Sequence, residues 1–493
     1  MNALFAIFVA LCVVPTVVLS ETAAQRARAA SPIKHVVVVM LENRAFDHMC
    51  GWLRQWNVPV DGLNGSQFNI ANGTKYLVRD DCPYVNPFDP LHDLQDTTSE
   101  IMGYGKTYVK PEPMDGFAET HMRHGFKDYW AVMHGFAPHR VPAISTIAKE
   151  FAVFDRYYAS LPGPTYPNRM FFHSGTSHGH VTDDLFTTIL PGVPQRTLYN
   201  VLGDNNISWG VYYSDVTDTI LFDQLRDWKN LQHNKGIDDL KKDAVNGNLP
   251  AFSWVTPRFF GLFGPPQDQH PDHDVVLGEE FVAEVYSAVR NAPTWNETLF
   301  IVTYDEHGGL YDHVPPPMDN VPNPDGINNA DTGFNFTRLG LRVCTVMASP
   351  RIPKGTVVHE PAEAPHQRFE HGSVYATLRQ LWNISEELTA RTAFAAPFDH
   401  IVSLAEPRTD CPTSLPTPAM TEAERAALWR ATNAKTPNGL QKHFHLMLEK
   451  ALGVTPEKMT GGKHHSTQAS ISHAVHEMME QVMAEAKAKA SQP

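Results

Sequence analysis

The sequence feature that most constrains the fold is the run IKHVVVVML at residues 33–41. Consecutive β-branched residues of this kind are typical of a strand buried on both faces, as in the parallel sheets of α/β proteins. Residues 208–213, 299–303 and 343–348 have the same character. Apolar residues at helical spacing occupy segments 45–56, 141–150, 221–231 and 279–290. The chain is therefore predicted to be an α/β protein with a mostly parallel sheet flanked by helices.

Composition limits the class of protein. Of the 493 residues, 42% are hydrophobic and 19% are charged, so the chain can bury a large core and is not disordered as a whole. The net charge is −14, and no stretch is basic enough to follow a phosphate backbone. These properties argue against nucleic acid as a partner.

The amino terminus predicts export. Residues 4–19 are apolar, and the small residues Ser20, Ala23 and Ala24 follow, so residues 1–24 are predicted to be a signal peptide. The alternative is a short membrane anchor, although the run is short for a span. No later segment has 18 consecutive apolar residues, so no transmembrane span is expected in the mature chain.

Cysteines and glycosylation motifs agree with a secreted, extracellular glycoprotein. Outside the predicted signal peptide there are four cysteines, which allow two disulfides in three pairings or, alternatively, four buried thiols. The cysteines are Cys50, Cys82, Cys344 and Cys411. There are also six Asn-X-Ser/Thr sequons. Their asparagines are Asn64, Asn72, Asn206, Asn296, Asn335 and Asn383.

The chain changes character near its C-terminal end. We predict one catalytic domain over residues 31–405, a linker rich in Pro and Thr at 406–420, and a helical region at 421–493. Helical patterns there cover residues 422–430, 441–452 and 470–489. They fit a small helical domain or a docked helix, and the alternative for the last one is a helix lying on a membrane surface.

Acidic and amide side chains follow two of the predicted strands directly. Glu42 and Asn43 follow the first strand, and Asp305 and Glu306 follow the strand at 299–303. In open α/β sheets, ligands bind beyond the carboxyl ends of the strands. Oxygen ligands from separate strands suit a divalent cation, which could be Ca, Mg, Mn or Fe. The alternative is that Glu42 or Asn43 only caps the following helix.

A hydroxyl and several histidines are further candidates. The segment LPGPTYPNR at 161–169 is expected to form a rigid turn that presents Thr165, with Arg169 placed to bind phosphate oxygens, unless it is a simple Pro-rich loop. His270, in DQHPDHD at 268–274, is a metal-ligand or acid–base candidate. His92 is a weaker candidate of the same kind. His313 could orient a ligand, protonate a leaving group or only hold its loop.

Several segments of the sequence resemble those of a known family. The segment HVVVVMLENRAFDHMCGWL at 35–53 is similar to the opening signature of the phosphoesterase family of bacterial phospholipases C and acid phosphatases, and most of all to plant-type non-specific phospholipases C. The resemblance covers roughly residues 33–415. Further ordered matches are HSGTSHG at 173–179, HPDHDVVLGEEFVAEVY at 270–286, TYDEHGGLYDHVPPP at 303–317, and FEHGSV at 369–374.

The resemblance implies an alkaline-phosphatase-like core and a smaller C-terminal domain. It also implies hydrolysis of glycerophospholipids, at a membrane surface, to diacylglycerol and a phosphorylated head group. Glu42, Asn43, Asp305 and Glu306 would then surround a metal and the phosphate. Thr165 takes the position of the nucleophile, which is Ser in the acid phosphatases. One departure is Ala45, where the signature usually has Ser.

The favoured hypothesis is a two-step displacement in which Thr165 attacks phosphorus and water then hydrolyses the phosphothreonine. His270 is the candidate general acid, and Glu306 is counted with the catalytic groups. Two alternatives stay open, namely a secreted acid phosphatase acting on monoesters and a non-catalytic protein that binds lipid or phosphate. An apolar mouth beside the phosphate site would favour the phospholipase over the monoesterase.

Overall fold

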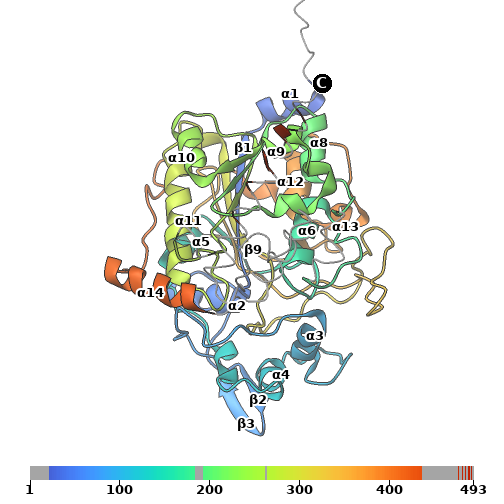
Figure 1. The fold of residues 1–493 in the computed structure, drawn as a ribbon, viewed down its shortest axis with the longest axis vertical. Coiled ribbons are helices and arrows are strands. Elements are labelled where there is room, and N and C mark those ends of the chain that lie inside the picture. Colours follow the sequence, from blue (N-terminus) through green and yellow to red (C-terminus); the bar gives the residue numbers. More distant parts are fainter. Residues whose placement is uncertain are drawn as a thin grey trace, which may run out of the picture.

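The computed structural model describes residues 22–183, 192–260 and 264–435, with isolated positions between 476 and 490. Its centre is an eight-stranded sheet in the order β11-β4-β10-β9-β1-β8-β6-β7 (Figure 1). Strand β10 is antiparallel to both of its neighbours, and the other pairings in this sheet are parallel. The strands are β1 (His35–Leu41), β4 (Ala152–Phe154), β6 (Trp209–Tyr213), β7 (Asn234–Gly236), β8 (Phe252–Thr256), β9 (Thr298–Tyr304), β10 (Thr345–Ala348) and β11 (Thr356–Val358).

Strand β1 lies at the centre of the sheet for a physical reason. It pairs with β8 on one side and β9 on the other, and residues 36–41 are all buried. A strand covered on both faces and both edges has no place for a charged side chain, which explains its valine-rich sequence. Polar residues therefore resume only where β1 ends, at Glu42.

Helices cover both faces of the sheet (Figure 1). One layer consists of α5 (Pro142–Glu150), α10 (Ile237–Val245) and α11 (Val275–Arg290), which pack against one another. The other consists of α1 (Ala23–Ala30), α6 (Thr165–Ser174), α8 (Leu198–Asp204) and α12 (Gly372–Trp382). This confirms the predicted mostly parallel α/β sheet with flanking helices.

A smaller lobe, residues 52–134, lies at the lower end of the molecule in Figure 1. It contains the hairpin β2 (Phe68–Ala71) and β3 (Thr74–Leu77), together with α3 (Leu94–Met102) and α4 (Phe117–Arg123). Strand β1 runs from α1 at the top to α2 lower down, so the carboxyl ends of the parallel strands point toward this lobe.

Shorter elements complete the described chain. They are α2 (Phe46–Met49), α9 (Trp228–Leu231), α13 (Ala390–Phe394), α14 (Glu422–Ala434), the pair β5 (Tyr157–Tyr158) and β12 (Phe369–Glu370), and the 3₁₀ helices Leu53–Trp56, Tyr129–Met133, Asp218–Leu221, Asp223–Leu225, Trp295–Glu297 and Asp399–Ile401.

All four predicted strands are present, but two of the predicted helices are not continuous. Residues 45–56 form the single-turn helix α2 and the 3₁₀ helix Leu53–Trp56. Residues 221–231 form two short 3₁₀ turns and a single helical turn. Strand β8, which neighbours β1, was not predicted, because Ser253 interrupts its apolar run. Helix α14 confirms the predicted helix at 422–430. The helical patterns at 441–452 and 470–489 lie outside the described residues, isolated positions apart.

The structure bears on three features from which export was predicted, namely the cysteines, the sequons and the amino terminus. Cys50 and Cys344 form a disulfide, whereas Cys82 and Cys411 are free, buried thiols, so one bridge forms where two were possible. All six sequon asparagines are exposed. The apolar stretch of the predicted signal peptide lies outside the described residues, and Ala23 and Ala24 begin helix α1. Among the helices that are described, none is long and apolar enough to cross a membrane.

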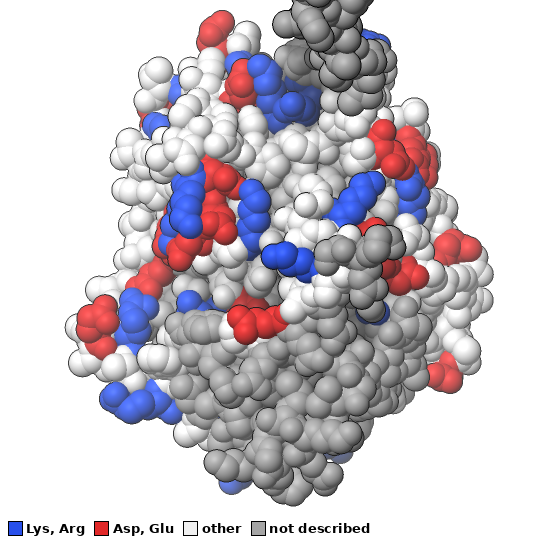
Figure 2. Space-filling model, turned by 45° about the horizontal axis from the view of Figure 1, so that its top comes forward, with Lys and Arg blue, Asp and Glu red and all other residues white. Residues whose placement is uncertain are grey.

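Figure 2 shows the charges on one face of the molecule. Lysine and arginine alternate with aspartate and glutamate on the described surface there and do not line up into a basic stripe.

Candidate active site

Residues far apart in the chain meet at the carboxyl end of the sheet. The backbone N–H of Asn43, just beyond β1, donates to Asp305 Oδ1 at 2.9 Å, just beyond β9. The hydroxyl of Thr165 donates to Asn43 Oδ1 at 3.2 Å. The three segments predicted to form one pocket therefore do converge. The parallel pairing of β1 with β9 brings the first two together, and α6 brings the third.

Thr165 does not lie in a loop, as the sequence indicated, but is the first residue of helix α6. Its hydroxyl is almost fully buried. The first turn of a helix carries free N–H groups and the positive end of the helix dipole. A phosphoryl group at this position would be held by the helix terminus, and negative charge developing on the threonine oxygen would be stabilised there.

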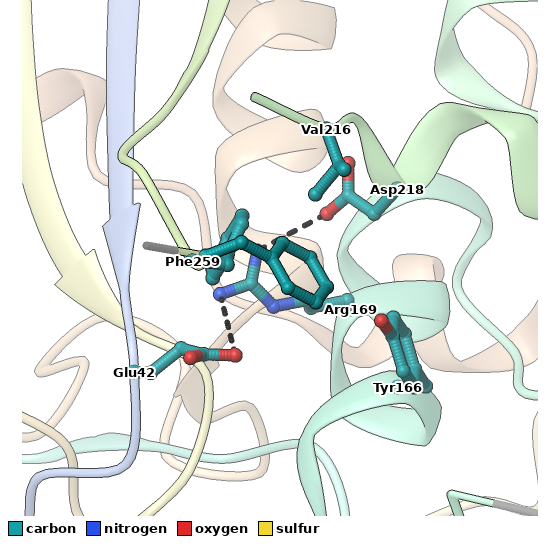
Figure 3. Close-up of a pocket in the computed structure, with 7 residues that line it drawn as sticks. Glu42, Tyr166, Arg169, Val216, Asp218 and Phe259 are labelled. Carbon is teal, nitrogen blue, oxygen red and sulfur yellow. Dashed lines mark hydrogen bonds and ion pairs between the residues drawn. The ribbon is translucent and has the colours of Figure 1, made fainter. Parts of the chain in front are cut away.

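Arg169 lies one turn further along α6 and connects the acidic residues (Figure 3). Its Nε donates to Asp305 Oδ2 at 3.0 Å, and its Nη1 donates to Asp218 Oδ2 at 3.2 Å. Its Nη2 lies 3.8 Å from Glu42 Oε1. The guanidinium is buried and surrounded by carboxylates, and these contacts favour a role as an internal counter-charge. Binding of phosphate by Arg169 stays a prediction.

Several buried carboxylate oxygens of the site accept no hydrogen bond from any described residue. They are both oxygens of Glu42, Oδ2 of Asp268 and Oε1 of Glu306. Leaving such oxygens unpaired in the interior is costly unless a cation satisfies them. Hard oxygen donors of this type fit a divalent metal. Asp305, in contrast, directs both oxygens at donors of the protein.

Three carboxyl groups of the site have shifted pKa values. Burial, and then the neighbouring Asp268, raise the pKa of Glu42 well above its usual range. Burial raises the pKa of Asp305 to about 6, although Arg169 opposes this. Burial opposes ionisation of Glu306 too, but His92 and His307 lower its pKa. The raised pKa values of Glu42 and Asp305 mean that ionising both carboxyl groups needs added positive charge, such as that of a bound cation.

Two of the predicted histidines lie at this site. His92 Nε2 is 3.3 Å from Asn43 Nδ2 and 3.8 Å from Glu306 Oε1. His270 Nδ1 is 2.5 Å from Asp272 Oδ1, and its ring lies beside that of His92. Burial would lower the pKa of both rings, but the carboxylates around them raise it to about 10 for His92 and about 9 for His270. His270, held by Asp272, is therefore placed to act as a proton donor, whereas Nε2 of His92 faces the Asn43 amide nitrogen and is placed to accept a hydrogen bond from it.

His313 belongs to a different cluster. Its Nδ1 lies 2.6 Å from Asp47 Oδ2, and Arg342 bonds both Asp47 and Asp312 at 2.9 Å. Every carboxylate oxygen in this network has a partner, which favours a structural role for His313. Substrate binding by His313 stays a prediction.

Two groups of side chains in the described part of the chain bring possible ligand atoms within 4.8 Å of one another. One is the Asp47, Asp312 and His313 network, and the other is His270, Asp272 and His273. Neither includes the predicted ligands Glu42, Asn43, Asp305 and Glu306, so that ligand set also stays a prediction.

The structure adds residues that sequence reasoning did not single out. Asp218 holds Arg169 and accepts from Trp254 Nε1 at 3.0 Å, and His173 Nε2 lies 3.3 Å away. His371 Nε2 lies 2.6 Å from the backbone oxygen of Asp305. Asp218 is in an unremarkable segment, VTDTI, and only its position below α6 reveals it. His371 lies within the segment FEHGSV, and this resemblance to the family was the one sequence feature that could have pointed to it.

A small cavity adjoins Glu42 and Arg169 (Figure 3). Its walls include the apolar side chains of Val216, Phe259 and Phe260. Its free space is about 10 Å³, which is room for one water. The rest of the wall is polar, with Glu42, Arg169 and Asp218, and the space is too small to accept an acyl chain.

A buried hydroxyl at a helix terminus, carboxylates with unpaired oxygens and a histidine placed as a proton donor, all beyond the carboxyl ends of parallel strands, are what a hydrolase that acts on phosphoric ester bonds needs. Sequence comparison agrees with this class. The chain belongs to the phosphoesterase family, whose model matches residues 33–385.

Several similar proteins are named phospholipases C. Non-specific phospholipase C6 of Arabidopsis thaliana is 44% identical over 78% of this chain and 75% of its own length. Non-specific phospholipase C1 of the same plant is 43% identical over 78% and 74%. The non-hemolytic phospholipase C of Pseudomonas aeruginosa is 24% identical over 86% and 64%.

Solved structures are more distant. The lipoteichoic acid synthase LtaP of Listeria monocytogenes has a TM-score of 0.38 at 8% identity over 93% of each chain. A protein of the alkaline phosphatase superfamily from Vibrio parahaemolyticus has a TM-score of 0.32 at 13% identity over 53% of this chain and 64% of its own.

Proposed function

We propose that this hydrolase is a non-specific phospholipase C, which cleaves glycerophospholipids to diacylglycerol and a phosphorylated head group. The single observation that carries the site is the contact of Thr165 with Asn43, which places a nucleophilic hydroxyl beside the carboxylates at the ends of β1 and β9. The relatives named phospholipase C, at 43–44% identity, support this substrate over a phosphomonoester.

In the first step, the Thr165 hydroxyl attacks phosphorus and the diacylglycerol oxygen leaves. The bond from phosphorus to the diacylglycerol oxygen breaks as the bond to Thr165 Oγ1 forms, the hydroxyl proton of Thr165 is released to water, and His270 gives a proton to the leaving oxygen. Asp272, 2.5 Å from His270 Nδ1, orients the ring for this task. In the second step, water attacks phosphorus and gives a proton to the neutral His270. The bond from phosphorus to Oγ1 breaks, Thr165 regains a proton from water, and the phosphorylated head group leaves.

Glu42, Asn43, Asp305 and Glu306 are the proposed ligands of a divalent metal, and Asp268 adds a further unpaired oxygen. Such an ion, when bound, supplies positive charge that stabilises an anionic phosphate and favours ionisation of a hydroxyl. Within the protein, Arg169 keeps Glu42 and Asp305 in place, and Asn43 orients the Thr165 hydroxyl.

The proposed location is extracellular, after removal of the signal peptide, with the enzyme acting at a membrane surface. The disulfide between Cys50 and Cys344 supports an oxidising compartment. The exposed position of all six sequon asparagines supports a glycosylated product. Glycosylation itself and the site of signal cleavage are part of this proposal.

Product analysis tests the proposal. The purified full chain is given phosphatidylcholine and, in parallel, a soluble phosphomonoester, and metal content is measured on the same sample. We expect diacylglycerol and phosphocholine, at a rate far above that of monoester hydrolysis, and a loss of rate on chelation that one divalent metal restores. Release of phosphate from the monoester alone would identify an acid phosphatase instead.

A further inference from the structure

The hairpin β2–β3 of the lobe presents an apolar outer face. Phe68 pairs with Leu77 and Ile70 pairs with Lys75, so these four side chains share one face of the hairpin. The three apolar side chains are exposed by 41% (Phe68), 53% (Ile70) and 47% (Leu77). In a hairpin with one face packed, the other face is normally polar. This outer face is not.

Contacts of the inner face fix which side of the hairpin points outward. Asn69 is buried and donates to the backbone oxygen of Met114 at 3.1 Å, and Tyr76 bonds the Tyr129 hydroxyl at 2.7 Å. Shifting the register by one residue would break these bonds and expose Asn69 and Ala71 in exchange. The apolar side chains are therefore fixed in the outward position.

Exposed apolar side chains are concentrated in this lobe. Of the eight large hydrophobic residues that are exposed in the described parts of the chain, six lie within residues 68–130. Such a concentration marks a surface that meets something apolar. The six are Phe68, Ile70, Leu77, Tyr104, Tyr108 and Trp130. The first three share the outer face of the hairpin, which we call the apolar lobe face.

The lobe adjoins the active site. It lies at the carboxyl ends of the parallel strands (Figure 1), and Glu100 of α3 lies 2.8 Å from His307, the residue after Glu306. A groove of the surface begins at Phe68 and Ile70 and extends to Tyr311, in the loop that follows β9. The apolar lobe face therefore lies on the same side of the molecule as the active site, beyond the carboxyl ends of the parallel strands.

We propose that the apolar lobe face docks on the surface of a phospholipid bilayer, with Phe68, Ile70 and Leu77 inserted below the head groups. This inference rests on the proposed function, because the scissile phosphoester lies in the head-group layer. The chemistry of the lobe fits that layer. Aliphatic and phenyl groups match the acyl region, and tyrosine and tryptophan rings match the interface.

The charges of the lobe decide which kind of bilayer it meets. Lys110 is paired with Asp319, and Arg123 is paired with Glu119. On the hairpin itself the single basic residue is Lys75, whose ammonium lies 3.8 Å from the centre of the Phe68 ring. Because the outer face of the hairpin carries three apolar side chains and one cation, docking is expected to depend mainly on apolar insertion and to work on a zwitterionic surface.

The test compares three full-length proteins. All carry Thr74→Ala and Ser66→Ala, which remove the sequons at Asn72 and Asn64 so that no glycan beside the hairpin can mask the face. The first has no other change, and the second carries Phe68→Ser, Ile70→Thr and Leu77→Thr. The matched control carries Val245→Thr, an exposed apolar residue on α10, outside the lobe.

Two measurements separate docking from chemistry. Flotation with phosphatidylcholine vesicles at 4 °C measures binding, and kcat/KM is measured on the vesicles and on monomeric dihexanoyl phosphatidylcholine. We expect the triple variant to lose about 100-fold in binding and in kcat/KM on vesicles, from three half-exposed side chains. Its kcat/KM on the monomeric lipid stays within about twofold, and the control matches the parent throughout.

Unchanged vesicle binding by the triple variant would overturn the proposal. An equal loss on monomeric and vesicle lipid would do so too, because it would indicate damage to the site. A parent that is a dimer by light scattering, with a monomeric triple variant and unchanged vesicle binding, would assign the face to a second copy. A parent that floats with vesicles but cleaves neither lipid would refute the proposed function and leave the docking intact.

Discussion

Substitutions of Thr165 test the proposed nucleophile most directly. Thr165→Val replaces the hydroxyl by a methyl group of nearly equal volume, and Thr165→Ala removes both branches. Thr165→Ser keeps the oxygen and serves as the matched control. If Oγ1 forms the bond to phosphorus, Val and Ala should each lower kcat by roughly 10⁴-fold or more, as loss of a nucleophile does elsewhere. Ser should stay within about tenfold of the parent.

The contacts of Thr165 determine how much folding stability each substitution loses. Thr165 is buried and its hydroxyl makes one hydrogen bond, to Asn43 at 3.2 Å. Losing that bond costs about 1 kcal/mol, and losing a buried methyl in the Ala variant costs about 0.8 kcal/mol more. The sum, about 2 kcal/mol, is well below the 5–15 kcal/mol that typically separates folded from unfolded protein, so all three variants should fold.

Diacylglycerol release from phosphatidylcholine is the assay, with circular dichroism and urea midpoints to confirm that each variant is folded. Stopping the reaction in acid should trap a phosphothreonine in the parent and none in the Val variant. If the folded Val and Ala variants both keep more than a tenth of the parent kcat, the hydroxyl does not attack phosphorus and the reasoning fails.

Three further predictions concern what holds the site. Replacing Cys50 and Cys344 by Ser opens a bridge between residues 294 apart, worth at most about 5–6 kcal/mol by chain entropy, so thermal unfolding should move down by about 5 °C, as it should with reductant. Asp218→Asn removes a buried partner of Arg169, and urea denaturation should show a loss of about 3–5 kcal/mol together with lower kcat. Burial raises the pKa of Glu279 to about 8. Its carboxyl stays protonated in the folded protein between pH 4.5 and 8 but ionises in the unfolded chain, so stability falls across that window, and Glu279→Gln should flatten the fall in urea midpoints.

Each of these has a matched control. Cys82→Ala alters a free buried thiol and should leave the response to reductant unchanged. Asp204→Asn removes an exposed partner of an arginine and should cost less than about 1 kcal/mol. Glu280→Gln, next to Glu279 but at the surface, should keep the slope of stability against pH. If a control variant changes the measured stability as much as its test variant does, the role assigned to the test residue is wrong.

Part of the fold could be predicted because burial is recorded locally in the sequence. The valines of β1 and the apolar residues of β9 and β10 have only one compatible environment, so their segments were found. Strand β8 was missed because its Ser253 is buried without breaking the strand, which no local pattern reveals. The broken segment at 221–231 has helical spacing but is held in 3₁₀ turns by contacts around Asp218 and Asp223.

The sequence by itself determined the chemistry of this protein: the acidic pairs after two strands, the threonine in LPGPTYPNR and the histidine before Pro271 are all visible in it. Only the tertiary structure decided their use. Parallel pairing of β1 with β9 brings residues 262 apart to 2.9 Å. Folding also buries Arg169 among carboxylates, draws His313 into a separate ion network and turns the apolar side chains of the hairpin outward. The reason is that local sequence fixes the type of a side chain and its periodicity, whereas its partners come from segments hundreds of residues away.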